Sequence, residues 1–184
     1  MRRRGRVCAR LRAAWLALAV GCAQAADGPG VAGQFDCADA FELVAMTVMV
    51  ACAGYQAPDD ARERIAQAEA RLLDARLATA GEFAGLRIAF CPLMQGTGMM
   101  PAPDRLYLDD GLQRMSVDGL AEIIAHELEH RRQFADLGVR GFKCAYVRDM
   151  SNCGGCQDRR HPLEREAYER QDRARDRLLS TPPA

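Results

Sequence analysis

The stretch from Ser116 to Gly138 constrains the fold more than any other part of the chain, because it carries the start, the apolar face and the end of one helix. Ser116 is a suitable N-cap, and Asp118 and Glu122 place negative charge near the positive end of the helix dipole. Apolar residues then recur at spacings of three and four: Leu120, Ile123, Ile124 and Leu128. Gly138 can take the left-handed conformation that ends many helices. The sequence therefore predicts a helix with one buried face.

Two histidines lie four residues apart inside this helix, in the sequence His126-Glu127-Leu128-Glu129-His130, which is H-E-x-x-H. Residues four apart share a helix face, so both imidazoles can point at one Zn²⁺ ion. Glu127 is rotated by about 100° around the helix, which places its carboxylate beside the metal site. A chance H-E-x-x-H on a surface helix is the alternative. The chain has only 3 histidines, and their concentration in the motif favours a metal site.

A catalytic zinc site takes a third protein ligand and keeps one position open. Four downstream side chains are candidates: Asp136, His161, Glu164 and Glu166. Asp136 is excluded, because on an unbroken helix it lies about 9 Å beyond His130 along the axis. Enzymes that use a ligand at that position break the helix at a glycine, and here Gln133 occupies it. The other three lie on, or just before, a final helix that can pack across the first.

The N-terminus has the three parts of a secretory signal peptide. Six arginines stand within residues 1–12, an apolar run follows at 13–20 that is too short to span a bilayer, and Ala23-Gln24-Ala25 is a suitable cleavage site. We therefore expect a signal peptide at 1–25 and a single exported domain at 26–184, periplasmic or secreted, with no transmembrane segment. Residues 27–36 are expected to be a flexible lead-in and 180–184 a short tail. Lipid anchoring through Cys22 and a basic cytosolic helix are the alternatives.

Removal of residues 1–25 changes the charge and the cysteine count. The remainder has 19 basic and 25 acidic residues, a net charge of about −6, which argues against a nucleic-acid partner. Six cysteines remain, and in an oxidising compartment they predict up to three disulfides. For Cys153-Gly154-Gly155-Cys156 we expect a disulfide. A thiol oxidoreductase and a structural metal site with Cys91 and Cys144 are the alternatives.

The remaining patterns predict an α+β, mainly helical fold. The segment from Cys37 to Ala53 is apolar nearly all round, as in a helix buried on most sides, with Met46 and Met49 in the core. The other expected elements are a helix from Asp60 to about Ala80 with a solvated charged face, strands at Leu86 to Cys91 and Arg105 to Leu108, a turn-rich connection at 92–104, and a helix from Pro162 to about Leu179.

Two segments resemble a known class of protein. His126-Glu127-Leu128-Glu129-His130-Arg131-Arg132-Gln133 matches H-E-L-x-H-x-x-Q, and Pro162-Leu163-Glu164-Arg165-Glu166-Ala167 is similar to the P-L-E-x-E-A segment that follows it in small bacterial zincin-like domains of the gluzincin type. The resemblance implies a compact zincin-like domain in which the active-site helix, beside a small sheet edge, packs on a C-terminal helix that carries a glutamate ligand. By this match the ligand is Glu164, with Tyr168 in the place of a family aspartate. Glu166 stays open.

The resemblance further implies zinc-dependent hydrolysis of a peptide or protein substrate. In that scheme His126, His130 and Glu164 hold one Zn²⁺, and Glu127 is the general base that takes a proton from water. His161 is expected either to contact substrate or to be a surface histidine. The competing hypotheses are a catalytically inactive binding or accessory domain and, less favoured, a thiol oxidoreductase that uses Cys153 and Cys156.

Overall fold

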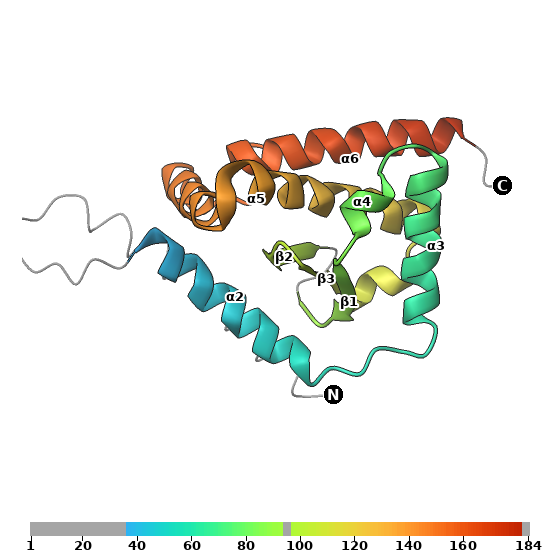
Figure 1. The fold of residues 1–184 in the computed structure, drawn as a ribbon, viewed down its shortest axis with the longest axis horizontal. Helices are drawn as coiled ribbons and strands as arrows, with labels where there is room; N and C mark the ends of the chain where they lie inside the picture. The colour runs from blue at the N-terminus through green and yellow to red at the C-terminus, as the bar shows by residue number, and fades with distance from the viewer. Residues whose placement is uncertain (1–35, 94–96, 182–184) are drawn as a thin grey trace, which may run out of the picture.

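The computed structural model describes residues 36–93 and 97–181. The predicted signal peptide, Cys22, nearly all of the expected lead-in and the last residues of the tail lie outside these described residues. The elements are α2 (Cys37–Ala53), α3 (Ala61–Asp74), α4 (Ala80–Phe83), β1 (Arg87–Cys91), β2 (Gly98–Ala102), β3 (Arg105–Asp109), η1 (Asp110–Arg114), α5 (Val117–Asn152) and α6 (Pro162–Ser180) (Figure 1). The prediction of an α+β, mainly helical fold is confirmed.

Helix α5 is the central element, and it contacts α6, α3, α2 and β2 (Figure 1). Its N-cap is the predicted one, since the Ser116 side chain accepts a hydrogen bond from the Gly119 backbone N–H. The predicted apolar face is buried: Leu120, Ile124 and Leu128 are at most 1% exposed. They join the buried leucines of β3 in the main hydrophobic core. Ile123 is only partly buried at the edge of that core.

Gly138 interrupts α5 without ending it. Its backbone has φ 70° and ψ 161°, a conformation that glycine adopts readily, and a second helical run continues from it to Asn152. The sequence correctly indicated the break at Gly138, but the helix beyond it was not predicted. Because the chain turns sharply here, the second run of α5 lies at an angle to the first (Figure 1).

The sheet has the order β1-β3-β2, with β1 parallel and β2 antiparallel to β3. The strands β1 and β3 were predicted, whereas β2 lies inside the segment that was expected to be only turns. The prolines and glycines of this segment caused the error, and among them Pro101 lies within β2, although proline cannot donate to a sheet ladder. It is tolerated since β2 is an edge strand whose register shifts between Met99 and Ala102.

Helix α2 has the predicted bounds, but it is less buried than its composition suggested. Its inner face packs against α5 and β2, and the described chain leaves its outer face uncovered. Met46, expected in the core, is 53% exposed, and Met49 is only partly buried. An apolar composition indicates that burial of a helix is favourable, but it does not show which of its faces other elements will cover.

The region after α2 also differs from the prediction. Helix α3 ends at Asp74 rather than near Ala80, and Arg76 then has a positive φ of 57° in the turn that leads to α4. The charges of α3 are not all solvated. Arg71 is 7% exposed, and its guanidinium donates to the Asp118 carboxylate and to the Leu178 carbonyl of α6. This buried arginine therefore joins α3 to both α5 and α6.

Three disulfides link the described elements: Cys37–Cys144, Cys52–Cys91 and Cys153–Cys156. The expectation of disulfides, including the one within Cys153-Gly154-Gly155-Cys156, is confirmed. The first two join the ends of α2 to the second run of α5 and to β1. Within the described residues no helix combines the length and the apolar character needed to cross a membrane.

Candidate metal centre

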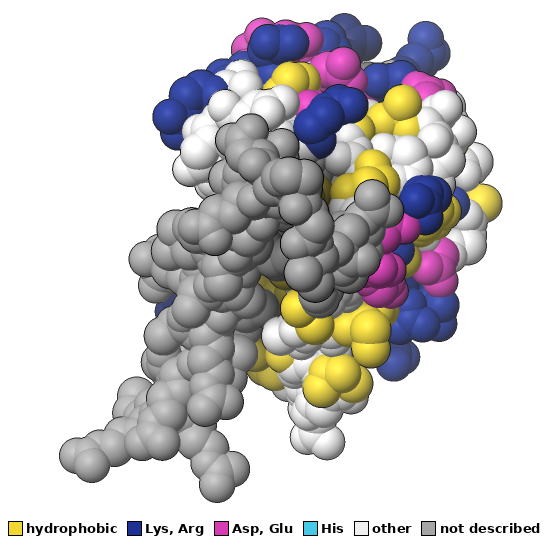
Figure 2. Space-filling view, turned by 90° about the vertical axis from the view of Figure 1, so that its left-hand side faces the viewer, with side chains coloured by type: hydrophobic (Ala, Val, Ile, Leu, Met, Phe, Trp, Pro, Cys, Tyr) yellow, Lys and Arg dark blue, Asp and Glu magenta, His cyan; other side chains and the backbone are white. Residues whose placement is uncertain are grey.

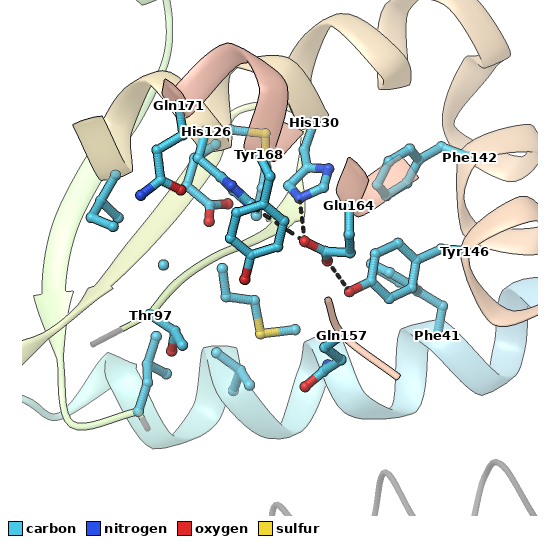
Figure 3. Close-up of a pocket in the computed structure, with 17 residues that line it drawn as sticks. Phe41, Thr97, His126, His130, Phe142, Tyr146, Gln157, Glu164, Tyr168 and Gln171 are labelled. Carbon is cyan, nitrogen blue, oxygen red and sulfur yellow. Dashed lines mark hydrogen bonds and ion pairs between the residues drawn. The ribbon is translucent and has the colours of Figure 1, made fainter. Parts of the chain in front are cut away.

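Three buried side chains converge where α5 crosses α6. Glu164 Oε2 lies 3.2 Å from His126 Nε2 and 3.7 Å from His130 Nε2 (Figure 3). One ligand atom from each residue lies within 4.8 Å of the others. The first run of α5 supplies both imidazoles from adjacent turns, and the first turn of α6 supplies the carboxylate. The structure thus brings together the two histidines of the motif and the glutamate that the resemblance implied.

Glu127 lies beside this group, as the helix geometry predicted. Its side chain is 3% exposed, and Oε2 has no hydrogen-bond partner among the described residues. The strand β2 packs closely on it, since a Cβ atom at Gly98 would lie 2.6 Å from Glu127 Oε1. Any larger residue at position 98 would therefore force the Glu127 carboxylate to move.

The donor set fits a metal ion. Two imidazole nitrogens and one carboxylate oxygen are the usual three protein ligands of a site that keeps one position open. His130 also has the outer partner that ligand histidines normally have, because its Nδ1 lies 2.9 Å from Gln133 Oε1. The buried group of His126, His130 and Glu164 can therefore hold a metal ion.

The electrostatics of the metal-free group reflect this mutual proximity. Burial alone would raise the pKa of Glu164, but hydrogen bonds and charge from His126 and His130 hold it well below its ordinary value. Burial alone would lower the pKa of His130, but the hydrogen bond to Glu164 and the charges of Glu164 and Glu127 raise it to about 9. Burial raises the pKa of Glu127, which the two histidines only partly offset.

Tyr146 is a site residue that the sequence did not reveal. Its hydroxyl donates to Glu164 Oε1, which leaves Oε2 facing the histidines. Burial, followed by the charge of Glu164, raises the pKa of Tyr146 well above its ordinary value, so the phenol remains a donor. Its ring centroid lies 6.2 Å from that of His130. On a straight helix sixteen residues would separate the two by about 24 Å, so the break at Gly138 places Tyr146 here.

A cavity of about 220 Å³ opens beside the group (Figure 3). Its lining is mostly apolar, and it draws on every element around the site: Phe41, Val48, Leu93, Thr97, Gly98, Met99, Met100, Ile123, His126, Glu127, His130, Phe142, Tyr146, Gln157, Glu164, Tyr168 and Gln171. Tyr168 lies one turn after Glu164 on α6, and its ring centroid is 4.7 Å from that of His126. Its hydroxyl points into the cavity (Figure 3).

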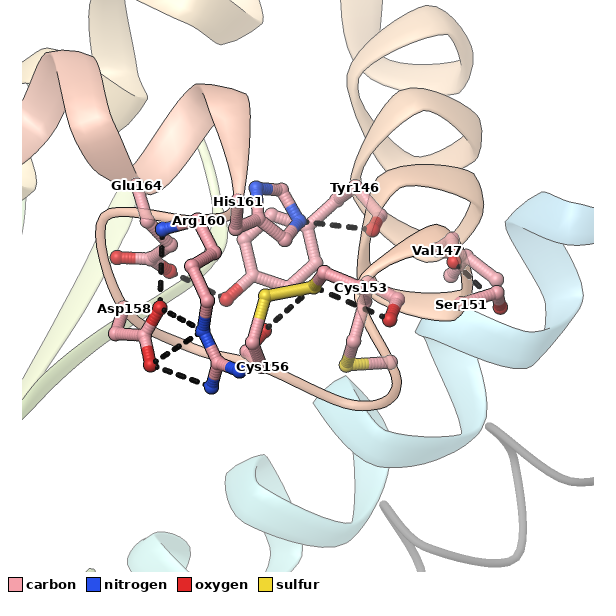
Figure 4. The surroundings of a disulfide bond; sticks show 10 residues. Tyr146, Val147, Ser151, Cys153, Cys156, Asp158, Arg160, His161 and Glu164 are labelled. Atoms are coloured by element: carbon pink, nitrogen blue, oxygen red, sulfur yellow. Dashed lines mark hydrogen bonds and ion pairs between the residues drawn. A yellow bond between two sulfur atoms is a disulfide. The ribbon is translucent and has the colours of Figure 1, made fainter.

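The other ligand candidates are held elsewhere. Glu166 accepts hydrogen bonds from Gln133 and Arg132, and Asp136 forms an ion pair with Arg132. His161 was expected to contact substrate or to lie at the surface; the surface position was wrong, and His161 is not among the residues that line the cavity. It is fully buried, and its Nε2 donates to the Tyr146 carbonyl, because the loop before α6 folds back under the second run of α5 (Figure 4).

The Cys153–Cys156 disulfide closes the C-terminal end of α5 (Figure 4). Gly154 and Gly155 have φ values of 74° and 84°, which glycine accommodates without strain. A reactive thiolate is favoured at a helix N-terminus, and a helix C-terminus disfavours negative charge. The position therefore gives no support to thiol redox chemistry. Gln157, next to this disulfide, lines the cavity.

Comparisons with known proteins supply no function to transfer. No protein-family model matches the chain, and no curated protein or solved structure matches it either. Any function must therefore follow from the chemistry of His126, Glu127, His130 and Glu164 and from the cavity beside them.

Proposed function

We propose that this chain is an exported, zinc-dependent peptidase of the gluzincin type. The observation that carries the proposal is the buried Glu127 carboxylate. Its Oε2 has no hydrogen-bond partner within residues 36–93 and 97–181, and it lies beside two imidazole nitrogens and a carboxylate that converge on one point. A carboxylate buried without a partner costs stability, and such a cost is typical of a functional group.

In this proposal the two histidines and Glu164 hold Zn²⁺. Bound there, the ion supplies a Lewis acid toward water and toward the carbonyl of the scissile bond. Glu127 takes the proton from the attacking water on its free oxygen and returns it to the leaving amine. Tyr146 keeps Glu164 Oε1 occupied, so that Oε2 is the oxygen presented to the ion.

A peptide or protein substrate suits the cavity. Apolar side chains of α2, β2 and the second run of α5 form most of its wall, so it favours a peptide with an apolar side chain next to the cleaved bond. The disulfides are of the kind that persists in an oxidising compartment, which supports export to the periplasm or the exterior.

The test is to compare the wild type with Glu127→Gln. The purified chain should contain about one zinc ion per molecule in elemental analysis and should cleave members of a random peptide library. Glu127→Gln should retain the zinc and lose on the order of 10²–10⁴-fold in cleavage rate, because the proton acceptor is gone.

Glu122→Gln is the matched control, because Glu122 lies on the same helix outside the cavity lining and should keep full activity. A wild type without zinc, or a Glu127→Gln variant that cleaves as fast as the wild type, would contradict the proposal. A wild type that binds zinc tightly and cleaves no peptide would instead support the accessory binding domain.

A further inference from the structure

Gln133 lies between the two ligand-bearing helices and is 2% exposed. Its Oε1 is 2.9 Å from His130 Nδ1. Its Nε2 donates to the Leu163 carbonyl at 3.0 Å and to Glu166 Oε2 at 2.9 Å. Both Nε2 partners lie at the start of α6, on either side of Glu164. One amide group therefore contacts a ligand histidine of α5 and the backbone next to the ligand glutamate of α6.

We propose that Gln133 is a positioning residue of the metal centre, which orients His130 and fixes the start of α6 at the distance that Glu164 needs. The chemistry of its partners sets the amide orientation. The Leu163 carbonyl and the Glu166 carboxylate can only accept, so the amide nitrogen faces them. The amide oxygen therefore faces His130 and requires a proton on Nδ1. In the neutral ring this leaves the lone pair on Nε2, the nitrogen directed at Glu164.

Neither an apolar nor an acidic side chain satisfies all three contacts. An apolar residue of similar size would leave the His130 N–H and the Leu163 carbonyl without partners in a buried position. A glutamate would accept from His130, but its second oxygen would face two acceptors, the Leu163 carbonyl and Glu166. The polar atoms of glutamine match the three partners one for one.

His126 provides the internal contrast. Its Nδ1 is buried and has no hydrogen-bond partner among the residues that the structure describes. The two ligand histidines are thus held differently. Both histidines contact Glu164 through Nε2. On the other side of the ring His130 is anchored by Gln133, whereas His126 is held by packing, which includes the edge-to-face contact with the Tyr168 ring. Loss of Gln133 should loosen one histidine and the glutamate together, while His126 stays in place.

The experiment measures metal binding by the purified, disulfide-bonded chain, and it needs no substrate. Zinc affinity is determined by competition with a chromophoric chelator, and the ligand geometry is followed by the visible absorption of bound Co²⁺. Gln133→Leu should weaken zinc binding about 10- to 100-fold, the range typical of an outer partner of a ligand histidine, and should alter the Co²⁺ spectrum. Gln67→Leu, at an exposed glutamine of α3, is the control and should change neither.

A second pair of variants separates positioning from general loss of stability. Gln133→Glu alone should weaken zinc binding, because its carboxylate faces Glu166. Adding Glu166→Gln should recover part of the affinity, since the new amide can donate to the new carboxylate while His130 keeps its acceptor. A purely structural role predicts that the melting temperature recovers without any recovery of zinc affinity.

Wild-type zinc affinity and an unchanged Co²⁺ spectrum in Gln133→Leu would overturn the inference, as would equal affinities for Gln133→Glu with and without Glu166→Gln. The inference rests on the proposed function only in requiring that the chain binds zinc. The two fail separately, because a wild type that binds zinc and cleaves nothing removes the peptidase proposal and leaves the affinity ratio between wild type and variants intact.

Discussion

The two walls of the cavity are held in different ways. On one side α5 and α6 carry the polar group, and buried hydrogen bonds such as that from Tyr146 to Glu164 fix it. On the other side α2 contributes apolar side chains, and a disulfide ties each of its ends, Cys37 to Cys144 and Cys52 to Cys91. The side of the cavity formed by α5 and α6, here called the polar wall, depends on hydrogen bonds whose partners must all be present. The side formed by α2, here called the α2 wall, depends on two disulfides and on apolar contacts.

This difference follows from what each helix can bury. Helix α5 is covered by neighbours on several sides, so buried polar groups such as His130 Nδ1 and the Gln133 amide have partners within the protein. Helix α2 packs through one face, and its outer face exposes Leu43, Met46 and Val50 at 57%, 53% and 75%. Figure 2 shows hydrophobic side chains at the surface on the end of the molecule that it faces. We therefore expect the two walls to respond to different perturbations.

Removing the longest-range disulfide should have the largest effect on stability and little effect on the metal. The double substitution Cys37→Ala and Cys144→Ala removes a disulfide between cysteines that are 107 residues apart in the sequence. By loop-closure entropy it should lower the free energy of unfolding by about 5 kcal/mol, measured by urea denaturation without reductant. Zinc affinity should stay near the wild-type value, because the candidate ligands lie on α5 and α6.

Cys153→Ala with Cys156→Ala is the matched control. These cysteines are only 3 residues apart in sequence, so the same entropy argument gives a smaller loss of about 2 kcal/mol. Equal losses for the two pairs, or a large fall in zinc affinity without the Cys37–Cys144 bond, would show that α2 is coupled to the polar wall.

The sequence predicted the polar wall better than the α2 wall. The histidine spacing depends only on helix geometry, so the positions of His126, Glu127 and His130 followed directly. The place of Glu164 came from the resemblance and not from spacing. Tyr146 was missed, because a glycine that ends a helix and a glycine that joins two helices look alike in sequence. Local sequence patterns do not show in which direction the chain continues after Gly138.

For α2 the sequence predicted both helix ends but not which face is covered. Its apolar residues occur all round the helix, and the neighbours that bury Phe41 and leave Val50 exposed come from distant parts of the chain. The same limit explains β2 and His161. Proline in an edge strand and a histidine under a returning loop are both settled by tertiary position, which one sequence does not give.

A change of pH should have the next largest effect on the free energy of unfolding, and this effect should come from the polar wall alone. In the metal-free protein the pKa of His130 is raised to about 9 from 6.5. A raised histidine pKa contributes stability that is fully present below 6.5 and is lost as the pH rises through 9. The loss should reach about 3 kcal/mol, measured by urea denaturation in EDTA across this range. The lowered pKa of Glu164 acts at the acid end, where its stabilisation is lost as the pH falls below 4.5.

Two comparisons identify the source of the alkaline loss. His130→Gln should remove it, and saturating Zn²⁺ should also remove it, because a ligand nitrogen cannot keep the proton. Burial raises the pKa of Glu127, so ionisation of this carboxylate also destabilises the folded protein as the pH rises. That loss of stability should remain in His130→Gln, which separates it from the loss due to His130. An alkaline loss of the same size in His130→Gln would assign it to other groups. The disulfide variants should retain the wild-type pH profile.

The smallest effect is expected on the outer face of α2, where Val50 is 75% exposed. Val50→Ser should change the free energy of unfolding by less than about 0.5 kcal/mol, because the side chain loses almost no buried area. Val48→Ser is the same substitution two residues earlier, at a valine that is 2% exposed and lines the cavity. It should cost more than about 2 kcal/mol, from lost apolar contacts and a buried hydroxyl.

The ratio of these two losses measures how one-sided the packing of α2 is in solution. A large difference means that α2 is held only through its inner face and its two disulfides, so that the cavity wall it forms has no further support from outside. Similar losses would mean that Val50 is covered in the intact protein. In that case α2 would be a core helix like α5, and the distinction between a covalently tied wall and a hydrogen-bonded wall would no longer hold.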